Sequence, residues 1–317
     1  MAYFLLKKTV GQSLEIEISK EEYERIQVAC DGIWTLIGIE EYWDSLVQNY
    51  IELEMEFLKA AMNSMVLTHR SFHEMHQIRL GFSRRLSNLL TSCKSYLDQT
   101  PHQLKEIEDC TFADSFESLK NAARESHFCY RAMSFLRNHA QHRNVPLHGA
   151  RFESSWIERP GVSKEEQELL RYSVSGNIDI AKLESDPELK SRLREEFKHQ
   201  AEHLDVAAVT REYIEALGAV HLGVRELTSS LLTKWKGIIQ ESIARYGSKT
   251  DGDVGGLCVT EFDETDTSKP KIEVFIDPIV HLETLMLRNG SMVNLRKRFV
   301  TNEIVSVKKS RVKRKAL

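Results

Sequence analysis

Long runs of apolar residues spaced three and four positions apart constrain this 317-residue chain more than any other feature. One run covers residues 40–68, a second covers 69–98 and a third covers 114–144. Apolar side chains at this spacing lie on one face of an α-helix. Gly and Pro, which interrupt helices, number only 15 and 6. The pattern predicts three long amphipathic helices joined by short turns, which is typical of an antiparallel bundle.

Local signals indicate where the N-terminal elements begin and end. The alternating segment Ser13–Ile18 suits a short strand, and Ser19 with Glu22 then forms a capping box that favours a helix start. Thr100 and Pro101 are expected to end the second long helix, because proline removes a backbone donor. These signals predict a short strand ahead of the helical bundle.

The C-terminal half combines helices with a small strand region. Residues 207–246 carry another helical stripe, and Asp186–Glu188 is expected to open a helix because its proline suits the first turn. Leu257–Phe262 and Lys271–Ile276 have the composition of two strands, and a last helix is expected over Ile279–Arg288. These signals predict a helical region followed by an α+β element in the C-terminal half.

Together these elements predict a mainly α fold in three parts. An antiparallel helical bundle with its short strand would occupy residues 1–158, a second helical region 159–250, and a small α+β element with a basic tail 251–317. The boundaries follow a Pro-Gly joint and a glycine-rich loop. That loop lacks the G-x-x-x-x-G-K-[ST] order of a phosphate-binding loop, so it indicates a linker.

Cysteine content and the N-terminal segment predict a cytoplasmic protein. Five cysteines, an odd number without a C-x-x-C pair, fit reduced thiols rather than a disulfide framework. The N-terminus lacks the apolar run of a signal peptide, and no segment has the length and apolarity expected of a membrane span. A net charge of −4 argues against general binding of polyanions.

Basic residues gather at the C-terminal end. Arg296–Arg298 is followed by Lys308, Lys309 and Arg311, after a neutral-to-acidic body. Such a tail favours contact with RNA phosphates or with an acidic partner. A solvated terminus without a ligand is the alternative interpretation.

One hexapeptide carries residue types suited to cutting RNA. Arg137–His142 reads Arg-Asn-His-Ala-Gln-His near the expected end of the third helix. A guanidinium can bind a phosphate through two hydrogen bonds, and an imidazole can move protons near neutral pH. The same Arg-to-His spacing starts at Arg143 and Arg194, but Pro146 interrupts the first of these copies and acidic neighbours flank the second.

Helical geometry separates the two ends of this hexapeptide. Arg137 falls on the apolar stripe of the third helix, so its charge needs a partner, a cleft or a second subunit. His142 lies five positions later, about 140° around an ideal helix, whereas Asn138 and His142 share a face. Pro146 is expected to loosen the last turn, which would let His142 swing toward Arg137.

The pattern Arg-Asn-x-x-x-His over Arg137–His142 resembles the signature of HEPN-type ribonucleases, and the similarity covers residues 40–150. The resemblance implies a HEPN-like helical bundle that forms a homodimer, in which two motifs meet in one composite site. It also implies that Arg137 contacts the scissile phosphate, that His142 is the general acid and base, and that Asn138 orients the histidine.

The same resemblance implies a metal-independent endoribonuclease that uses no cofactor. Attack by a 2′-hydroxyl on the neighbouring phosphate would leave a 2′,3′-cyclic phosphate. We expect further RNA contacts from Arg143 and His148 beside the motif and from the basic tail. Such an activity would suit a toxin or a phage-defence effector, with an antitoxin or regulatory protein as a further partner.

Two alternatives to a ribonuclease stay open. His69, His73 and His76 lie at i, i+4 and i+7, so one helical face could hold Zn²⁺ in a metal-binding bundle enzyme. The other alternative is a non-catalytic helical module that binds RNA or a protein. Loss of cleavage in Arg137→Ala and His142→Ala would favour the ribonuclease, and sensitivity to a chelator would favour the metal enzyme.

Overall fold

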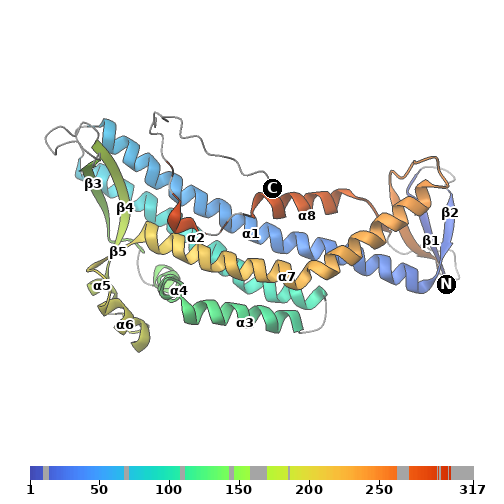
Figure 1. The fold of residues 1–317 in the computed structure, drawn as a ribbon, viewed down its shortest axis with the longest axis horizontal. Helices are drawn as coiled ribbons and strands as arrows, with labels where there is room; N and C mark the ends of the chain where they lie inside the picture. The colour runs from blue at the N-terminus through green and yellow to red at the C-terminus, as the bar shows by residue number, and fades with distance from the viewer. Residues whose placement is uncertain are drawn as a thin grey trace, which may run out of the picture.

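The protein is mainly helical, and three long helices form its framework (Figure 1). The computed structural model describes residues 1–9, 14–67, 71–107, 111–142, 146–157, 170–184, 186–262, 271–290, 292, 294–298 and 300. α2 (Phe72–Ile107) and α7 (Val206–Gly247) both pack against α1 (Lys20–Val66). The 47 residues of α1 extend about 70 Å along the molecule. None of the described helices has the length and apolarity needed to cross a membrane.

α1 begins where the capping box predicts and continues without a break through the predicted stripe at 40–68. The Ser19 hydroxyl accepts a hydrogen bond from the Glu22 amide at 3.1 Å, which satisfies one of the donors left unpaired at a helix start. Buried residues extend from Ile26 through Trp43 to Ala60. One helix, rather than a short one followed by a long one, therefore contributes to the core along its whole length.

The prediction that the second helix ends at Thr100 and Pro101 is wrong. α2 continues to Ile107 with the proline inside it. Pro101 cannot donate to a carbonyl of the preceding turn, but the Thr100 hydroxyl donates to the Tyr96 carbonyl at 2.7 Å. Leu104, beyond the proline, is fully buried, and this packing favours a continued helix.

The prediction of one helix over residues 114–144 is also wrong, because two helices occupy this stretch. α3 (Thr111–Ser126) and α4 (Phe128–His142) are separated at His127. The Ser126 hydroxyl donates to the carbonyl four residues earlier at 2.6 Å, a bond that competes with the helical ladder and bends helices. The two helices run in different directions, and both contact α7 (Figure 1).

A four-stranded antiparallel sheet closes one end of the molecule (Figure 1). Its order is β2 (Glu15–Ile18), β1 (Ala2–Lys7), β6 (Leu257–Phe262) and β7 (Ile272–Glu273). The sequence predicted strands at β2, β6 and β7 but not at β1. The predicted last helix is present as α8 (Asp277–Arg288), which packs on α1.

Pairing of β1 with β6 joins the N-terminal segment to the C-terminal part of the chain. Leu6 lies opposite Cys258 in this pair, and both side chains are buried. α7 and α8 pack on α1 as well. Elements from the predicted parts 1–158, 159–250 and 251–317 therefore share one core, because each part covers a portion of the α1 surface.

A second antiparallel sheet lies at the opposite end of the molecule (Figure 1). Its strands are β3 (Gly149–Trp156), β4 (Leu170–Asp179) and β5 (His203–Asp205). None of them was predicted. β3 is largely exposed and carries few apolar residues, and β4 and β5 lie within residues 159–250, which were wrongly expected to be helical throughout. The short helices α5 (Ile180–Glu184) and α6 (Ser191–Lys198) connect β4 to β5, and α6 starts later than the sequence predicted.

A buried polar network ties α1, α2 and α7 together. Arg225 donates two hydrogen bonds of 2.7 Å to the Glu40 carboxylate, and His221 Nε2 lies 3.2 Å from the same carboxylate. The Tyr96 hydroxyl lies 3.0 Å from His221 Nδ1, and Trp43 stacks on the imidazole. A neutral imidazole protonated on Nε2 donates to Glu40 and accepts from Tyr96. Burial lowers the pKa of His221 and so favours this neutral form.

Candidate functional site

α4 carries a groove bordered by α2 and α3 on one side and by α6 on the other. A pocket of about 250 Å³ opens toward α2 and α3, and a pocket of about 310 Å³ opens toward α6. Arg124, Ser134 and Asn138 line both pockets, so we name the two together the α4 groove. The other lining residues are Leu90, Lys94, Leu97, Asp98, Lys120, Glu125, Tyr130, Arg131, Phe135, Arg137, Glu188, Lys190, Arg192, Leu193 and Tyr213.

The α4 groove is cationic, although the whole chain has a net charge of −4. Among the described residues, Arg124 and Arg137 form no ion pair with a carboxylate. Two guanidinium groups without an ion-pair partner favour an anionic ligand. The cations are Lys94, Lys120, Arg124, Arg131, Arg137, Lys190 and Arg192, against the carboxylates Asp98, Glu125 and Glu188.

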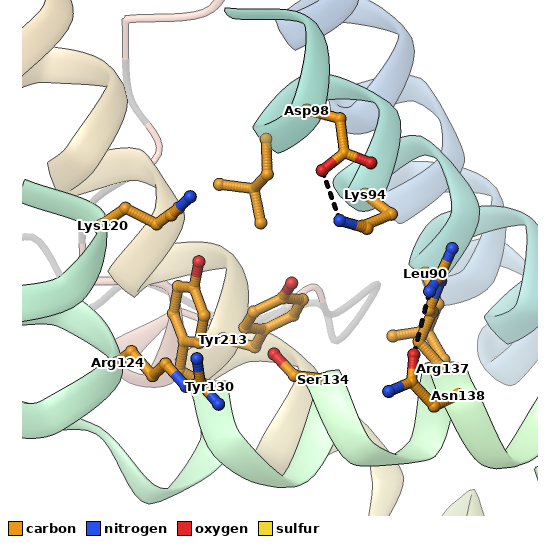
Figure 2. Close-up of a pocket in the computed structure, with 11 residues that line it drawn as sticks. Leu90, Lys94, Asp98, Lys120, Arg124, Tyr130, Ser134, Arg137, Asn138 and Tyr213 are labelled. Carbon is orange, nitrogen blue, oxygen red and sulfur yellow. Dashed lines mark hydrogen bonds and ion pairs between the residues drawn. The ribbon is translucent and has the colours of Figure 1, made fainter. Parts of the chain in front are cut away.

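Arg137 enters the groove from the C-terminal half of α4 (Figure 2). Its Nη1 donates to Asn138 Oδ1 at 2.9 Å, so the neighbouring amide holds the guanidinium in place. Asn138 thus contacts the arginine, whereas the resemblance implied that it orients a histidine. Arg137 Nε is enclosed, and it has no hydrogen-bond partner within the described part of the chain. An enclosed N–H without a partner is costly.

Two tyrosines stand beside these cations in Figure 2. Tyr130 of α4 and Tyr213 of α7 meet edge to face with their ring centroids 5.3 Å apart. Burial raises the pKa of both phenols, so both hydroxyl groups keep their protons at neutral pH. Aromatic rings next to guanidinium groups suit a nucleotide, because the rings contact a base or ribose while the cations bind phosphate.

Ion pairs hold the α6 side of the groove. Arg131 donates from Nε and Nη2 to the Glu196 carboxylate at 3.0 and 2.6 Å, and this contact lowers the pKa of Glu196. Arg192 of α6 pairs with Glu125 of α3. These two arginines are therefore engaged within the chain, and the arginines open to a ligand lie toward α2 and α3.

The structure does not bring His142 to Arg137 within one chain. α4 stays helical through His142, so the loosening expected ahead of Pro146 does not occur within α4. Five helical positions keep the two side chains about 140° apart around the axis. His142 is exposed and lines neither pocket of the α4 groove. One copy of the chain therefore presents Arg137 and Asn138 in the groove and His142 outside it.

A different histidine of the hexapeptide has a carboxylate partner. His139 Nδ1 lies 2.7 Å from Asp186 Oδ2, and the two side chains are only 10% and 3% exposed. Asp186 also accepts a hydrogen bond from the Glu188 amide at 2.9 Å. The pair fastens the end of α4 to the turn ahead of α6. No local sequence pattern indicates this pair, because the two residues are 47 positions apart.

The other predicted site residues are not gathered in the α4 groove. The half-buried His148 accepts a hydrogen bond from the Asp179 amide at Nδ1, and burial lowers its pKa. His73 and His76 are exposed near the start of α2. The RNA and metal contacts expected of residues beyond the described ranges stay predictions. These residues are His69, Arg143, Lys308, Lys309 and Arg311.

One other cluster combines side chains of metal-ligand type. His127, Cys129 and Glu212 place their ligand atoms within 4.8 Å of one another. Burial raises the pKa of the Cys129 thiol to about 12, and Arg296 lies 3.5 Å from the Glu212 carboxylate. A protonated thiol and a guanidinium already at the carboxylate both disfavour a bound cation. We therefore assign no metal to this cluster.

The α4 groove combines unpaired guanidinium groups, hydroxyl donors and aromatic rings within one surface feature. This arrangement can bind a phosphate next to a sugar or a base. The lining residues of the groove come mainly from α2, α3, α4, α6 and α7, so its chemistry comes from side chains that are distant in the sequence. Comparison of the chain with protein-family models, with curated proteins and with solved structures finds no match.

Proposed function

We propose that the α4 groove binds RNA and that the chain is a metal-independent endoribonuclease. The observation that supports this most directly is the placement of Arg124 and Arg137, which lack carboxylate partners among the described residues. Both lie in one pocket with Tyr130 and Tyr213. Contacts from arginine to phosphate and from aromatic rings to bases are the means by which proteins hold single-stranded nucleic acid.

In the proposed reaction the ribose 2′-hydroxyl attacks the adjacent phosphorus. The O2′–P bond forms while the P–O5′ bond breaks, which leaves a 2′,3′-cyclic phosphate and a 5′-hydroxyl. Arg137 would stabilise the negative charge that develops on the phosphorane. His142 would take the proton from the 2′-hydroxyl and return a proton to the leaving oxygen.

A strand lying along α4 would meet these residues in succession. Asn138 contacts Arg137, and it shares a helix face with His142, which lies about 6 Å further along the axis. In the homodimer implied by the resemblance, His142 would come instead from the second copy. Mixing Arg137→Ala and His142→Ala chains separates these arrangements, because only a composite site regains activity in the mixture.

The biological setting of this proposal has two sources. The cysteine content and the N-terminal segment predict a cytoplasmic location, whereas the resemblance alone implies a toxin or phage-defence effector that an antitoxin or another regulatory protein controls. The groove geometry supports the binding of a phosphate and is neutral about the setting.

Cleavage of labelled total RNA or tRNA in EDTA tests the proposal. The comparison includes wild type, Arg137→Ala, His142→Ala and the control Arg25→Ala, which changes an exposed arginine of α1. We expect wild type and the control to cleave RNA, and the other two variants to lose activity by about 100-fold or more. Equal cleavage by all four proteins would contradict the assignment of the motif.

RNA binding, followed by fluorescence anisotropy, separates the competing functions. Arg124→Ala and Arg137→Ala should each weaken binding and reduce its salt dependence by about one unit in the log–log slope. Binding without cleavage would favour the non-catalytic module. Cleavage that survives Arg137→Ala and His142→Ala but is lost with a chelator would favour the metal enzyme built on His69, His73 and His76.

A further inference from the structure

The outer face of α1 carries an apolar stripe that the described part of the chain leaves open. Ile51, Met55, Leu58, Met62 and Met65 recur at intervals of four, three, four and three residues. Their side chains are between 42% and 61% exposed. We name these five residues the outer α1 stripe. Such regular exposure differs from the scattered surface leucines and methionines that occur on most proteins.

The same stretch of α1 already contributes its opposite face to the core. Leu53 and Phe57 are at most 5% exposed within the bundle. The outer α1 stripe is therefore not needed to fix α1 within one chain. Apolar exposure continues at the end of α1 and the start of α2, where Val66, Leu67 and Phe72 are 64%, 53% and 88% exposed.

The spacing identifies the kind of surface that fits this stripe. Intervals of four and three place the residues alternately at the a and d positions of a two-helix seam. An anionic lipid surface is a poor fit, because Glu52, Glu54 and Glu56 flank the stripe. We propose that the outer α1 stripe binds a second copy of this chain, with the two α1 helices antiparallel.

Charges beside the stripe favour the antiparallel direction. In that arrangement Glu52 lies near Lys59 of the second copy, and the contact occurs twice by symmetry. Glu52 pairs with Arg85 in its own chain but stays 48% exposed, and Lys59, whose Nζ lies 4.0 Å from Glu56, is 69% exposed. In a parallel pair Lys59 would face Glu54, which Arg211 already holds through two hydrogen bonds of 2.7 Å.

The extent of the surface also suits a pair of chains. A stable interface buries about 800 Å² on each partner, whereas monomers rarely expose apolar patches of more than a few hundred Å². The stripe spans more than three helical turns, and Val66, Leu67 and Phe72 add large apolar side chains at the end of α1 and the start of α2. The proposal does not rest on RNA cleavage, because the stripe lies on α1 and the groove on α4.

Sedimentation velocity of the full chain without RNA tests the interface. We expect a dimer at micromolar concentration, and a dissociation constant about 100-fold higher or more for Met55→Glu/Met62→Glu. Leu287→Glu, at an 83% exposed position of α8, serves as the control and should stay dimeric. Far-UV circular dichroism should match wild type in both variants, because all three positions are exposed.

A monomeric wild type at about 100 µM overturns the proposal, as does a dimer that both stripe substitutions leave intact. A monomer that floats with anionic vesicles would assign the stripe to a lipid surface and overturn it as well. Cysteine cross-linking fixes the direction. The antiparallel pair predicts disulfide formation between mixed Met55→Cys and Leu58→Cys chains, whereas cross-linking of Met55→Cys with itself alone would overturn that arrangement.

Discussion

Close approach of two long helices depends on a single glycine. A Cβ added at Gly32 of α1 would lie 2.5–2.7 Å from three ring atoms of Trp235 of α7, which is itself buried. The indole ring of Trp235 is rigid, so α1 and α7 would have to move apart to make room for the added Cβ. We expect Gly32→Ala to lower the free energy of unfolding by about 1–3 kcal/mol in urea denaturation.

Gly237→Ala is the matched control on α7, because no atom lies within 4 Å of the added Cβ. This exposed helical position should instead gain about 0.5–1 kcal/mol of stability, since alanine favours the helix more than glycine does. Equal losses at Gly32 and Gly237 would contradict the role of the Trp235 contact.

At the scale of elements, the buried network between α1, α2 and α7 should make stability depend on pH. Burial lowers the pKa of His221 from its ordinary value of 6.5. Below that pH the unfolded chain binds the proton more readily than the folded chain does. The free energy of unfolding therefore decreases as the pH is lowered. Burial alone would raise the pKa of Glu40, but hydrogen bonds from Arg225 and His221 lower it, so its contribution is lost on further acidification.

Both groups change stability in the same direction, so urea denaturation should show a steady loss of stability from pH 7 to pH 4. His221→Gln should flatten the part of this dependence that lies near pH 6, because the titrating imidazole is gone. The control His76→Gln changes an exposed histidine and should leave the profile unchanged. A profile identical in all three proteins would contradict the role of His221.

The extent to which elements could be predicted from sequence follows from how each one is stabilised. The helix predicted over 207–246 is present as α7, because its own stripe and the Asp205 cap define it. The ends of helices were harder to predict than their interiors. α2 continues beyond Pro101 because Leu104 is buried against other elements, and this burial cannot be read from the local sequence. β3 was missed because its pairing with β4, rather than its composition, makes it a strand.

The candidate site was predictable only in part for a similar reason. Arg137 and Asn138 stand out because the hexapeptide is contiguous in the sequence. Arg124 and Tyr213 reach the same pocket from α3 and α7, and no local pattern connects them to the motif. The predicted proximity of His142 to Arg137 required a loosened helix end, whereas the hydrogen bonding of α4 continues through His142.

At the scale of the whole molecule, one shared core makes a definite prediction for fragments. The segment 1–158 lacks β6, α7 and α8, which cover β1 and α1 in the full chain. We expect this fragment to show no cooperative unfolding transition by circular dichroism, because its α1 surface would lose most of its cover. Co-expression with a fragment spanning 159–317 should restore the transition, and a cooperative transition of 1–158 alone would contradict a shared core.

The pairing of β1 with β6 also governs how the protein matures on the ribosome. The buried thiol of Cys258 and the carbonyl of Leu6, in contact across this pair, are 252 positions apart. At about 5–20 residues per second, translation takes roughly 13–50 s to supply the second strand after the first. During that interval the nascent chain carries an unpaired strand edge and an uncovered helix, the kind of surface that aggregates or recruits chaperones. β1 is therefore among the first segments to be synthesised, but its partner strand β6 becomes available only late in synthesis.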